Sequence, residues 1–173
     1  AYLRAAVPPR YWWLQRTTLS IPYSANIEIP SLLPGLGGWA AIVSDMSDAE
    51  LERNKLTAKA FYDLMFNQCR PAEAVERYVG ATYIQHNPEL ADGKEGFIAY
   101  FEQMAADHPG KRVEFKCVVA EGDRVVLHCH QLWPQEEYAG IDIFRFDASG
   151  KIVEHWDVLQ VIHPVSKNPN TMF

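Results

Sequence analysis

The sequence predicts an α+β domain in which helices cover one face of an antiparallel β-sheet. Apolar residues recur at helical spacing over residues 47–107, they alternate with polar residues over 113–162, and the two patterns occupy separate halves of the chain. Helices that precede an antiparallel sheet are typical of α+β domains. A curved sheet covered in this way forms a cone with an apolar closed end, which is a natural site for a small molecule.

Three helices are expected in the first half. The segment Ser47–Glu50 has the pattern of a capping box and should open a helix that runs to about Asn67. Pro71 suits the first turn of a second, short helix, which Gly80 should end. A third helix is expected over 92–107, because its apolar residues follow helical spacing up to a His-Pro-Gly turn.

Four strands are expected in the second half, joined in order as an antiparallel meander. Turn-forming residues separate alternating segments, which cover residues 113–120, 125–133, 141–146 and 151–162. Helices followed by such a meander should place all three helices on the same face of the sheet.

The last two strands carry acidic and imidazole side chains at positions where a core would have apolar ones. Asp147–Gly150 is a turn sequence, so the strands on either side should form a hairpin. If the residues next to this turn pair with each other, Asp142 lies opposite His155. Side chains alternate along a strand, so Asp142, His155 and Asp157 should share a face. The apolar residues expected on that face are Phe144, Val153 and Leu159.

Composition limits the classes of partner. The chain has 173 residues, 48% of them hydrophobic, which is enough for one globular domain with a sizeable core. With 16 basic and 22 acidic residues, the formal charge of −6 argues against nucleic acid or an anionic membrane as partner. The three cysteines lack CxxC spacing, and no run of 18 apolar residues is present. We expect a soluble, cytoplasmic protein with reduced thiols that binds a small apolar molecule.

Residues 1–45 differ from the rest of the chain, because five prolines interrupt every periodic pattern while tyrosine and tryptophan are frequent. We expect an N-terminal extension over 1–45, a domain over 46–164 and a tail over 165–173. The extension is interpreted either as an arm packed on the domain or on a partner, or as an upstream extension of a gene whose working start is Met46. The second interpretation fits a domain that begins at that methionine.

Asp157 is the first candidate for chemistry. It lies in mid-strand between Trp156 and Val158, where a carboxylate must pair, stay hydrated or become protonated. Burial among aromatic residues raises an aspartate pKa toward the range that suits general acid–base catalysis. Asp142 and His155 are candidates for tuning this carboxylate. The alternatives are an ion pair with a neighbouring strand or a polar cluster that only fixes strand register.

Further candidates surround the expected pocket. His86 and Asn87 could orient a substrate carbonyl where the chain crosses the mouth of the cone, although Asn before Pro is also ordinary turn chemistry. The expected walls of the substrate site are Phe144 and Trp156 and, on one strand face, His128 and His130. A metal site that combines these two histidines with Asp142 or His155 is a further alternative.

The segments DIFRFDASGKIVEHWDVLQ, YIQHNP and LHCH and the three leading helices resemble the SnoaL-like polyketide cyclase group of the nuclear transport factor 2-like superfamily, over about Met46–Pro164. The resemblance implies a cone-shaped, cystatin-like fold, a homodimer and intramolecular aldol chemistry without metal or organic cofactor. By motif position, the acid/base aspartate of those cyclases falls on Asp157. A histidine that is usual in them falls on Asp142.

Three functions follow as hypotheses. The first is a cofactor-independent enzyme that moves a proton next to the carbonyl group of a small apolar compound, in an aldol-cyclisation or isomerase reaction, with Asp157 as acid/base. The second is a non-catalytic module that uses the same cone to hold a ligand or to dimerise. The third is a metal-dependent hydrolase or dioxygenase that uses His128 and His130.

Overall fold

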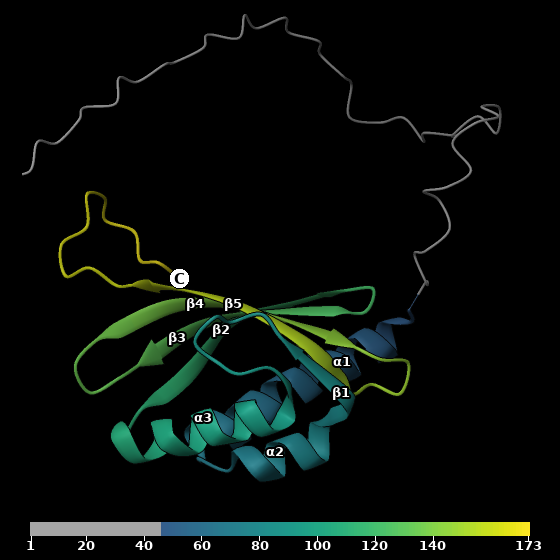
Figure 1. The fold of residues 1–173 in the computed structure, drawn as a ribbon. Helices are drawn as coiled ribbons and strands as arrows, with labels where there is room; N and C mark the ends of the chain where they lie inside the picture. Colours follow the sequence, from purple (N-terminus) through teal and green to yellow (C-terminus); the bar gives the residue numbers. More distant parts are fainter. Residues whose placement is uncertain (1–45) are drawn as a thin grey trace, which may run out of the picture. The chain divides into compact units, whose positions relative to one another are not determined.

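The computed structural model describes residues 46–173 (Figure 1). The predictions made for residues 1–45 lie outside the described residues, and the domain boundaries stay a prediction. The elements are α1 (Asp48–Tyr62), the π-helical segment η1 (Asp63–Asn67), α2 (Pro71–Tyr78), β1 (Val79–Gln85), α3 (Gly93–Asp107), β2 (Arg112–Glu121), β3 (Arg124–Leu132), β4 (Glu137–Phe146) and β5 (Ile152–Val161).

The start of α1 has the predicted capping box. The Ser47 backbone N–H donates to Glu50 Oε2 at 2.9 Å, and the Glu50 N–H donates to Ser47 Oγ at 3.4 Å. Helical backbone continues to Asn67 as predicted, but its last turn is the π-helix η1. Asn67 fastens this end to β2, because its side chain accepts from the Val113 N–H at 2.7 Å and donates to the Val113 carbonyl at 3.2 Å.

The second helix is shorter than predicted, and a fifth strand replaces its expected end. Helix α2 stops at Tyr78, and β1 begins at once and pairs in parallel with β5. Gly80 therefore ends no helix. A Cβ at Gly80 would lie only 2.9 Å from Val153 Cγ1, so glycine allows β1 to approach β5 closely.

The α+β prediction is confirmed, whereas the prediction of a wholly antiparallel sheet is wrong. The sheet is mixed and has five strands in the order β1-β5-β4-β3-β2, with β2 to β5 forming the predicted antiparallel meander. All three helices lie on the same side of this sheet, below it in Figure 1. Buried and more exposed residues alternate along β3 and β4, which gives the sheet one covered face and one open face.

The β4–β5 hairpin differs from the predicted register by two residues. Asp142 is paired with Asp157, and Phe144 is paired with His155. The register shifts between Arg145 and Phe146, so that Phe146 pairs with Ile152. A displacement of two residues preserves the face of every side chain, because strand side chains repeat every second residue. The prediction that Asp142, His155 and Asp157 share a face therefore survives the wrong pairing.

Aromatic side chains join the helices to the covered face. Phe61 of α1 stacks on Phe97 of α3 with ring centroids 5.4 Å apart, and meets Phe144 of β4 edge-on at 5.8 Å. These rings are at most 1% exposed, so they form the closed end of the cone. Among residues 46–173, no helix is both long enough and apolar enough to cross a membrane.

Candidate functional site

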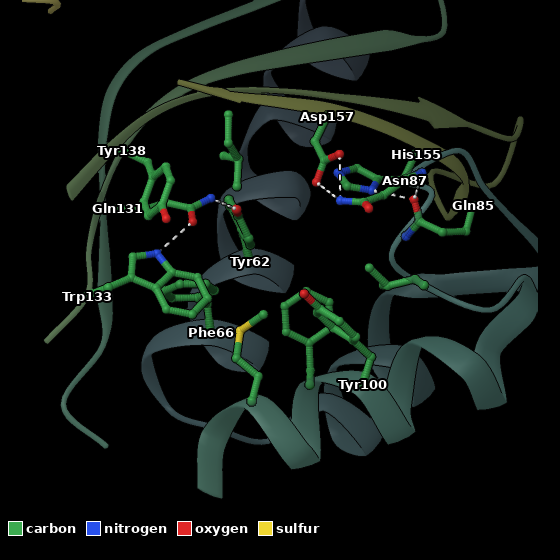
Figure 2. A pocket seen from close by; sticks show the side chains of 14 residues that line it. Tyr62, Phe66, Gln85, Asn87, Tyr100, Gln131, Trp133, Tyr138, His155 and Asp157 are labelled. Carbon is green, nitrogen blue, oxygen red and sulfur yellow. Dashed lines mark hydrogen bonds between the residues drawn. The ribbon is translucent and has the colours of Figure 1, made fainter. Parts of the chain in front are cut away.

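A cavity of about 220 Å³ lies between the covered face of the sheet and the helices (Figure 2). Aromatic and aliphatic side chains form most of its wall, and its polar groups include Asp157, His155, three side-chain amides and tyrosine hydroxyls. The lining residues are Tyr62, Phe66, Gln85, Asn87, Leu90, Tyr100, Phe101, Met104, Gln131, Trp133, Tyr138, His155, Asp157 and Leu159.

Asp157 is held by a single amide from the loop after β1. The Asn87 Nδ2 donates to Asp157 Oδ1 at 2.9 Å and to Oδ2 at 2.8 Å. The Asn87 Oδ1 accepts from the Glu89 N–H at 2.9 Å, so this Asn-Pro turn fixes which end of the amide faces the carboxylate. Asp157 and Asn87 are 70 residues apart in the chain, and the parallel pairing of β1 with β5 brings them together.

Opposing effects act on the pKa of Asp157. Burial is the largest and raises it, while the charge of His155 and the hydrogen bonds from Asn87 lower it, and the charge of Asp142 raises it again. The net result is a pKa above the usual aspartate value of 3.8. A raised pKa makes Asp157 a stronger base than an exposed aspartate.

His155 lies between two acceptor groups. Its Nδ1 is 3.2 Å from Gln85 Oε1, which also accepts from the Asn87 N–H at 3.0 Å, so Nδ1 must carry a proton and donate. Its Nε2 is 3.3 Å from Asp142 Oδ1. Two bare lone pairs would repel each other at this distance, so a second proton lies between Nε2 and the carboxylate. The pair of Asp142 and His155 is neutral wherever that proton is placed.

Asp142 is the most deeply buried acid of the site. It is 0% exposed, and within the described residues its Oδ2 has no hydrogen-bond partner. Burial first, and the charge of Asp142 second, raise the pKa of both the Tyr62 hydroxyl and the Cys129 thiol. Tyr62 and Cys129 therefore stay protonated as neutral groups beside Asp142. Such a site depends on the His155 partner for its stability.

A chain of hydrogen bonds crosses the opposite wall. Trp133 Nε1 donates to Gln131 Oε1 at 3.1 Å, and Gln131 Nε2 donates to the Tyr62 hydroxyl oxygen at 2.7 Å. Because Tyr62 accepts from Gln131, its own O–H proton is free of that chain and can be donated elsewhere. The Tyr62 hydroxyl is thus a neutral donor held in place by Gln131, with a pKa raised first by burial and then by the charge of Asp142.

The three residues predicted to be catalytic come together in the structure. One ligand atom from each of Asp142, His155 and Asp157 lies within 4.8 Å of the other two. The same three side chains could hold a metal ion, since two carboxylates and an imidazole are a common donor set. A metal would have to replace the proton between His155 and Asp142. The histidines that the sequence suggested as metal ligands, His128 and His130, are not in this group.

The other predicted site residues are divided among three places. Asn87 lines the cavity, whereas Phe144 lies behind it, 1% exposed and stacked on the His155 ring at 4.7 Å. His86 points away from the cavity, where it stacks on Trp156 with ring centroids 4.7 Å apart and contacts Glu154 at 2.9 Å. Neither His86 nor Trp156 lines the cavity.

His128 and His130 lie on the open face of the sheet, and the expectation that they line the substrate site is corrected. Their neighbours Leu127 and Cys129 are fully buried on the covered face, so strand alternation directs both histidines outward. Both rings contact Phe173 of the C-terminal tail, with centroids 5.3 and 4.7 Å away.

Gln85 is the polar site residue that the sequence reasoning missed most plainly. Its neighbours His86 and Asn87, in the same YIQHNP segment, are predicted site residues because the chain is expected to cross the mouth of the cone there. The signal was strand periodicity: Tyr83 and Gln85 alternate with Ile84, so once β1 is accepted as a strand, Tyr83 and Gln85 must face inward. The lining residues Tyr62, Gln131 and Tyr138 carried no comparable signal.

Comparison with known proteins agrees with this architecture. The model of the SnoaL-like domain family matches residues 58–155, which is more than half of the chain. This chain belongs to the SnoaL-like domain family. No curated protein matches it significantly.

Solved structures share the fold at low sequence identity. TsrD from Streptomyces laurentii is 19% identical with a TM-score of 0.54, over 66% of this chain and 90% of TsrD. A proposed polyketide cyclase from Bacillus cereus is 20% identical with a TM-score of 0.57, over 66% of this chain and 79% of that protein. An LEH-like epoxide hydrolase from M. tuberculosis is 16% identical with a TM-score of 0.53, over 64% of this chain and 85% of the hydrolase. These similarities establish the nuclear transport factor 2-like fold alone, because one fold hosts many reactions.

Proposed function

We propose that this SnoaL-like protein is a cofactor-independent enzyme that moves a proton at the carbon next to a carbonyl group of a small, largely apolar compound, in an aldol-cyclisation or isomerase reaction. Asp157 is the acid/base. The observation that carries this proposal is a carboxylate with a raised pKa that lines a largely apolar cavity and is oriented by Asn87.

The proton transfer begins with Asp157 ionised. One of its oxygens takes the α-proton, the electron pair of the broken C–H bond moves into the enolate, and the same carboxylic acid later returns the proton to carbon or oxygen. The Asn87 amide holds both oxygens while this happens, which keeps the carboxylate aimed at one substrate position. His155 and Asp142 act as positioning residues, because their shared proton keeps a neutral pair next to Asp157.

The developing enolate oxygen needs a hydrogen-bond donor. The Tyr62 hydroxyl suits this role, because it lines the cavity, is neutral, and accepts from Gln131 without using its own proton. A neutral phenol in a site that excludes water stabilises an oxyanion without the cost of reorganising solvent. Replacing Tyr62 by phenylalanine should reduce turnover more than substrate binding.

Exchange of α-protons for deuterium tests this proposal directly. Cyclic ketones and 1,3-diketones in D2O should lose their α-proton NMR signals faster with the wild type than without protein. The Asp157→Asn variant should lose about 10²–10⁴-fold in rate, because general base catalysis contributes this much. Glu154→Gln, a variant three residues away on the open face, is the matched control and should keep the wild-type rate. Equal exchange rates in the wild type and Asp157→Asn would remove Asp157 from the mechanism.

The alternative function is a non-catalytic module that holds a small ligand in the same cavity. The observation that favours it is the low polarity of most of the lining, which would retain an apolar molecule without any reaction. Mass spectrometry distinguishes the two functions. A bound compound recovered unchanged after incubation supports the binding module, whereas a product with altered mass or connectivity contradicts it.

The open face of the sheet is proposed as the contact between two copies of the chain. It exposes the apolar side chains Val158 at 67%, Val119 at 53% and Ile84 at 41%. Light scattering coupled to gel filtration should give twice the chain mass, and Val158→Asp should shift the protein to the monomer. A monomer at all concentrations in the wild type would contradict this proposal.

A further inference from the structure

The cavity carries a net negative charge that its own lining does not offset. Lysine and arginine are absent from the lining residues, all of which belong to the described part of the chain. His155 is the single basic residue among them, and its proton is shared with Asp142 in a neutral pair. The charge of an ionised Asp157 therefore faces the cavity without an opposite charge of its own.

We infer that this cavity selects organic cations, so that the substrate carries a protonated amine or a quaternary ammonium group. The inference deepens the proposed function and rests on it in one respect, because it takes the cavity as the substrate site. A carboxylate accepts hydrogen bonds and cannot donate them, so Asp157 favours ligands with N–H donors or positive charge and disfavours anions.

The wall across the cavity from Asp157 is aromatic. Figure 2 shows the Asp157 carboxylate on one side and the rings of Trp133, Phe66 and Tyr100 on the other. An organic cation close to the face of an aromatic ring is attracted by the electron density of that face, and tryptophan attracts it most strongly. A carboxylate combined with such rings recognises an ammonium group through charge and through dispersion contacts with its alkyl substituents.

The position of Lys111 limits where in the cavity a ligand cation is expected to bind. Its Nζ lies 4.4 Å from the centroid of the Phe66 ring and donates to the Phe66 carbonyl at 2.8 Å, although Lys111 does not line the cavity. A ligand cation at Phe66 would therefore meet a positive charge behind the ring. The ammonium group is therefore expected between Asp157 and the rings of Trp133 and Tyr100 rather than at Phe66.

The pKa of a tyrosine in the cavity wall also indicates that the cavity has a negative electrostatic potential. The pKa of Tyr100, which lines the cavity, is raised first by burial and then by the charges of Glu89 and Asp157. Carboxylates that oppose a phenolate at this hydroxyl also oppose an anionic ligand. The same field stabilises a cation that enters the cavity.

Three probes of similar size and different charge test the inference: cyclohexylmethylamine, cyclohexylmethanol and cyclohexanecarboxylate. At pH 7 they are a cation, a neutral molecule and an anion. Calorimetric titration of the wild type should give about tenfold tighter binding of the amine than of the alcohol, and no binding of the carboxylate. An alcohol that binds as tightly as the amine, or a wild type that binds none of the three, overturns the inference.

Variants test whether the preference for the amine over the alcohol arises in the cavity. Asp157→Asn should bind the amine about tenfold more weakly and the alcohol unchanged, whereas Glu154→Gln removes one charge from the other face and should keep the wild-type preference. Trp133→Leu should lower the ratio of amine to alcohol affinity. An unchanged ratio in Asp157→Asn overturns the inference.

The same probes separate this inference from the proposed function. Selective binding of the amine by a protein that exchanges no α-protons would contradict the proposed enzyme and support the cation site. Catalysed α-proton exchange by a protein that binds the amine and the alcohol equally would support the proposed enzyme and contradict the cation site.

Discussion

The two faces of β5 place similar carboxylates in opposite electrostatic situations. Asp157 faces the cavity, where burial has the largest effect and its pKa is raised. Glu154 faces outward, where burial also acts to raise its pKa, but hydrogen bonds and charges from His86 and Arg145 prevail and the pKa is lowered. The surroundings of each carboxylate, and not the acid itself, therefore decide whether its pKa is raised or lowered.

The largest expected effect is a loss of stability, and it should differ between substitutions on the two faces of β4. Asp142→Ala should lower the free energy of unfolding by about 3 kcal/mol, because it leaves the 6% exposed His155 without its partner. Arg145→Ala removes a charge from the open face of the same strand and should cost about 1 kcal/mol or less. Denaturation in urea measures both. A smaller loss for Asp142→Ala than for Arg145→Ala would show that the buried pair does not stabilise the fold.

Asn87→Ala and His86→Ala compare adjacent residues that point in opposite directions. Losing the two hydrogen bonds to Asp157 should lower kcat for α-proton exchange about tenfold. Those bonds lower the pKa of Asp157. In Asn87→Ala, the fall of kcat at acidic pH, where Asp157 becomes protonated, should therefore begin at higher pH. His86→Ala should leave the profile in place. A shift in His86→Ala of the same size would show that Asn87 has no special role.

Asp157 and Glu154 should affect stability with opposite signs. The folded-state pKa of Asp157 is raised, so its contribution to stability is present at low pH and is lost as pH rises through that pKa. Glu154 has a lowered pKa, so its contribution is present at neutral pH and is lost on acidification. At pH 7, Asp157→Asn should raise Tm, whereas Glu154→Gln should lower the unfolding free energy by up to about 1 kcal/mol. Thermal scans from pH 7 down to pH 3 should show both differences shrink. A lower Tm for Asp157→Asn than for the wild type at pH 7 would contradict the prediction that ionised Asp157 destabilises the folded protein.

The smallest effect is expected on the open face of β3. Replacing both His128 and His130 by alanine should leave α-proton exchange unchanged and change the unfolding free energy by about 1 kcal/mol or less, because both rings are outside the cavity. Gln131→Ala, one position further on the covered face, should reduce exchange by removing the donor to Tyr62. Loss of exchange in the histidine variant would mean that the reaction takes place elsewhere.

Local patterns were sufficient for much of the fold. The capping box, the three helices and the change to period two each depend on neighbouring residues, and the structure has all of them. Alternation also placed Asp142, His155 and Asp157 on one face without the correct pairing. The strand β1 was missed because its residues Val79–Gln85 follow a helix directly and its partner in the sheet, β5, is about 70 residues away.

The sequence by itself determined which side chains of each strand share a face, because the alternation of a strand is a local property of the backbone. It also determined where the first helix begins. The tertiary structure alone decided which face is covered by helices, and that Asn87 holds Asp157 while Gln85 and Asp142 hold His155. These contacts depend on the parallel pairing of β1 with β5 and on burial, and both arise from segments that are distant in the chain.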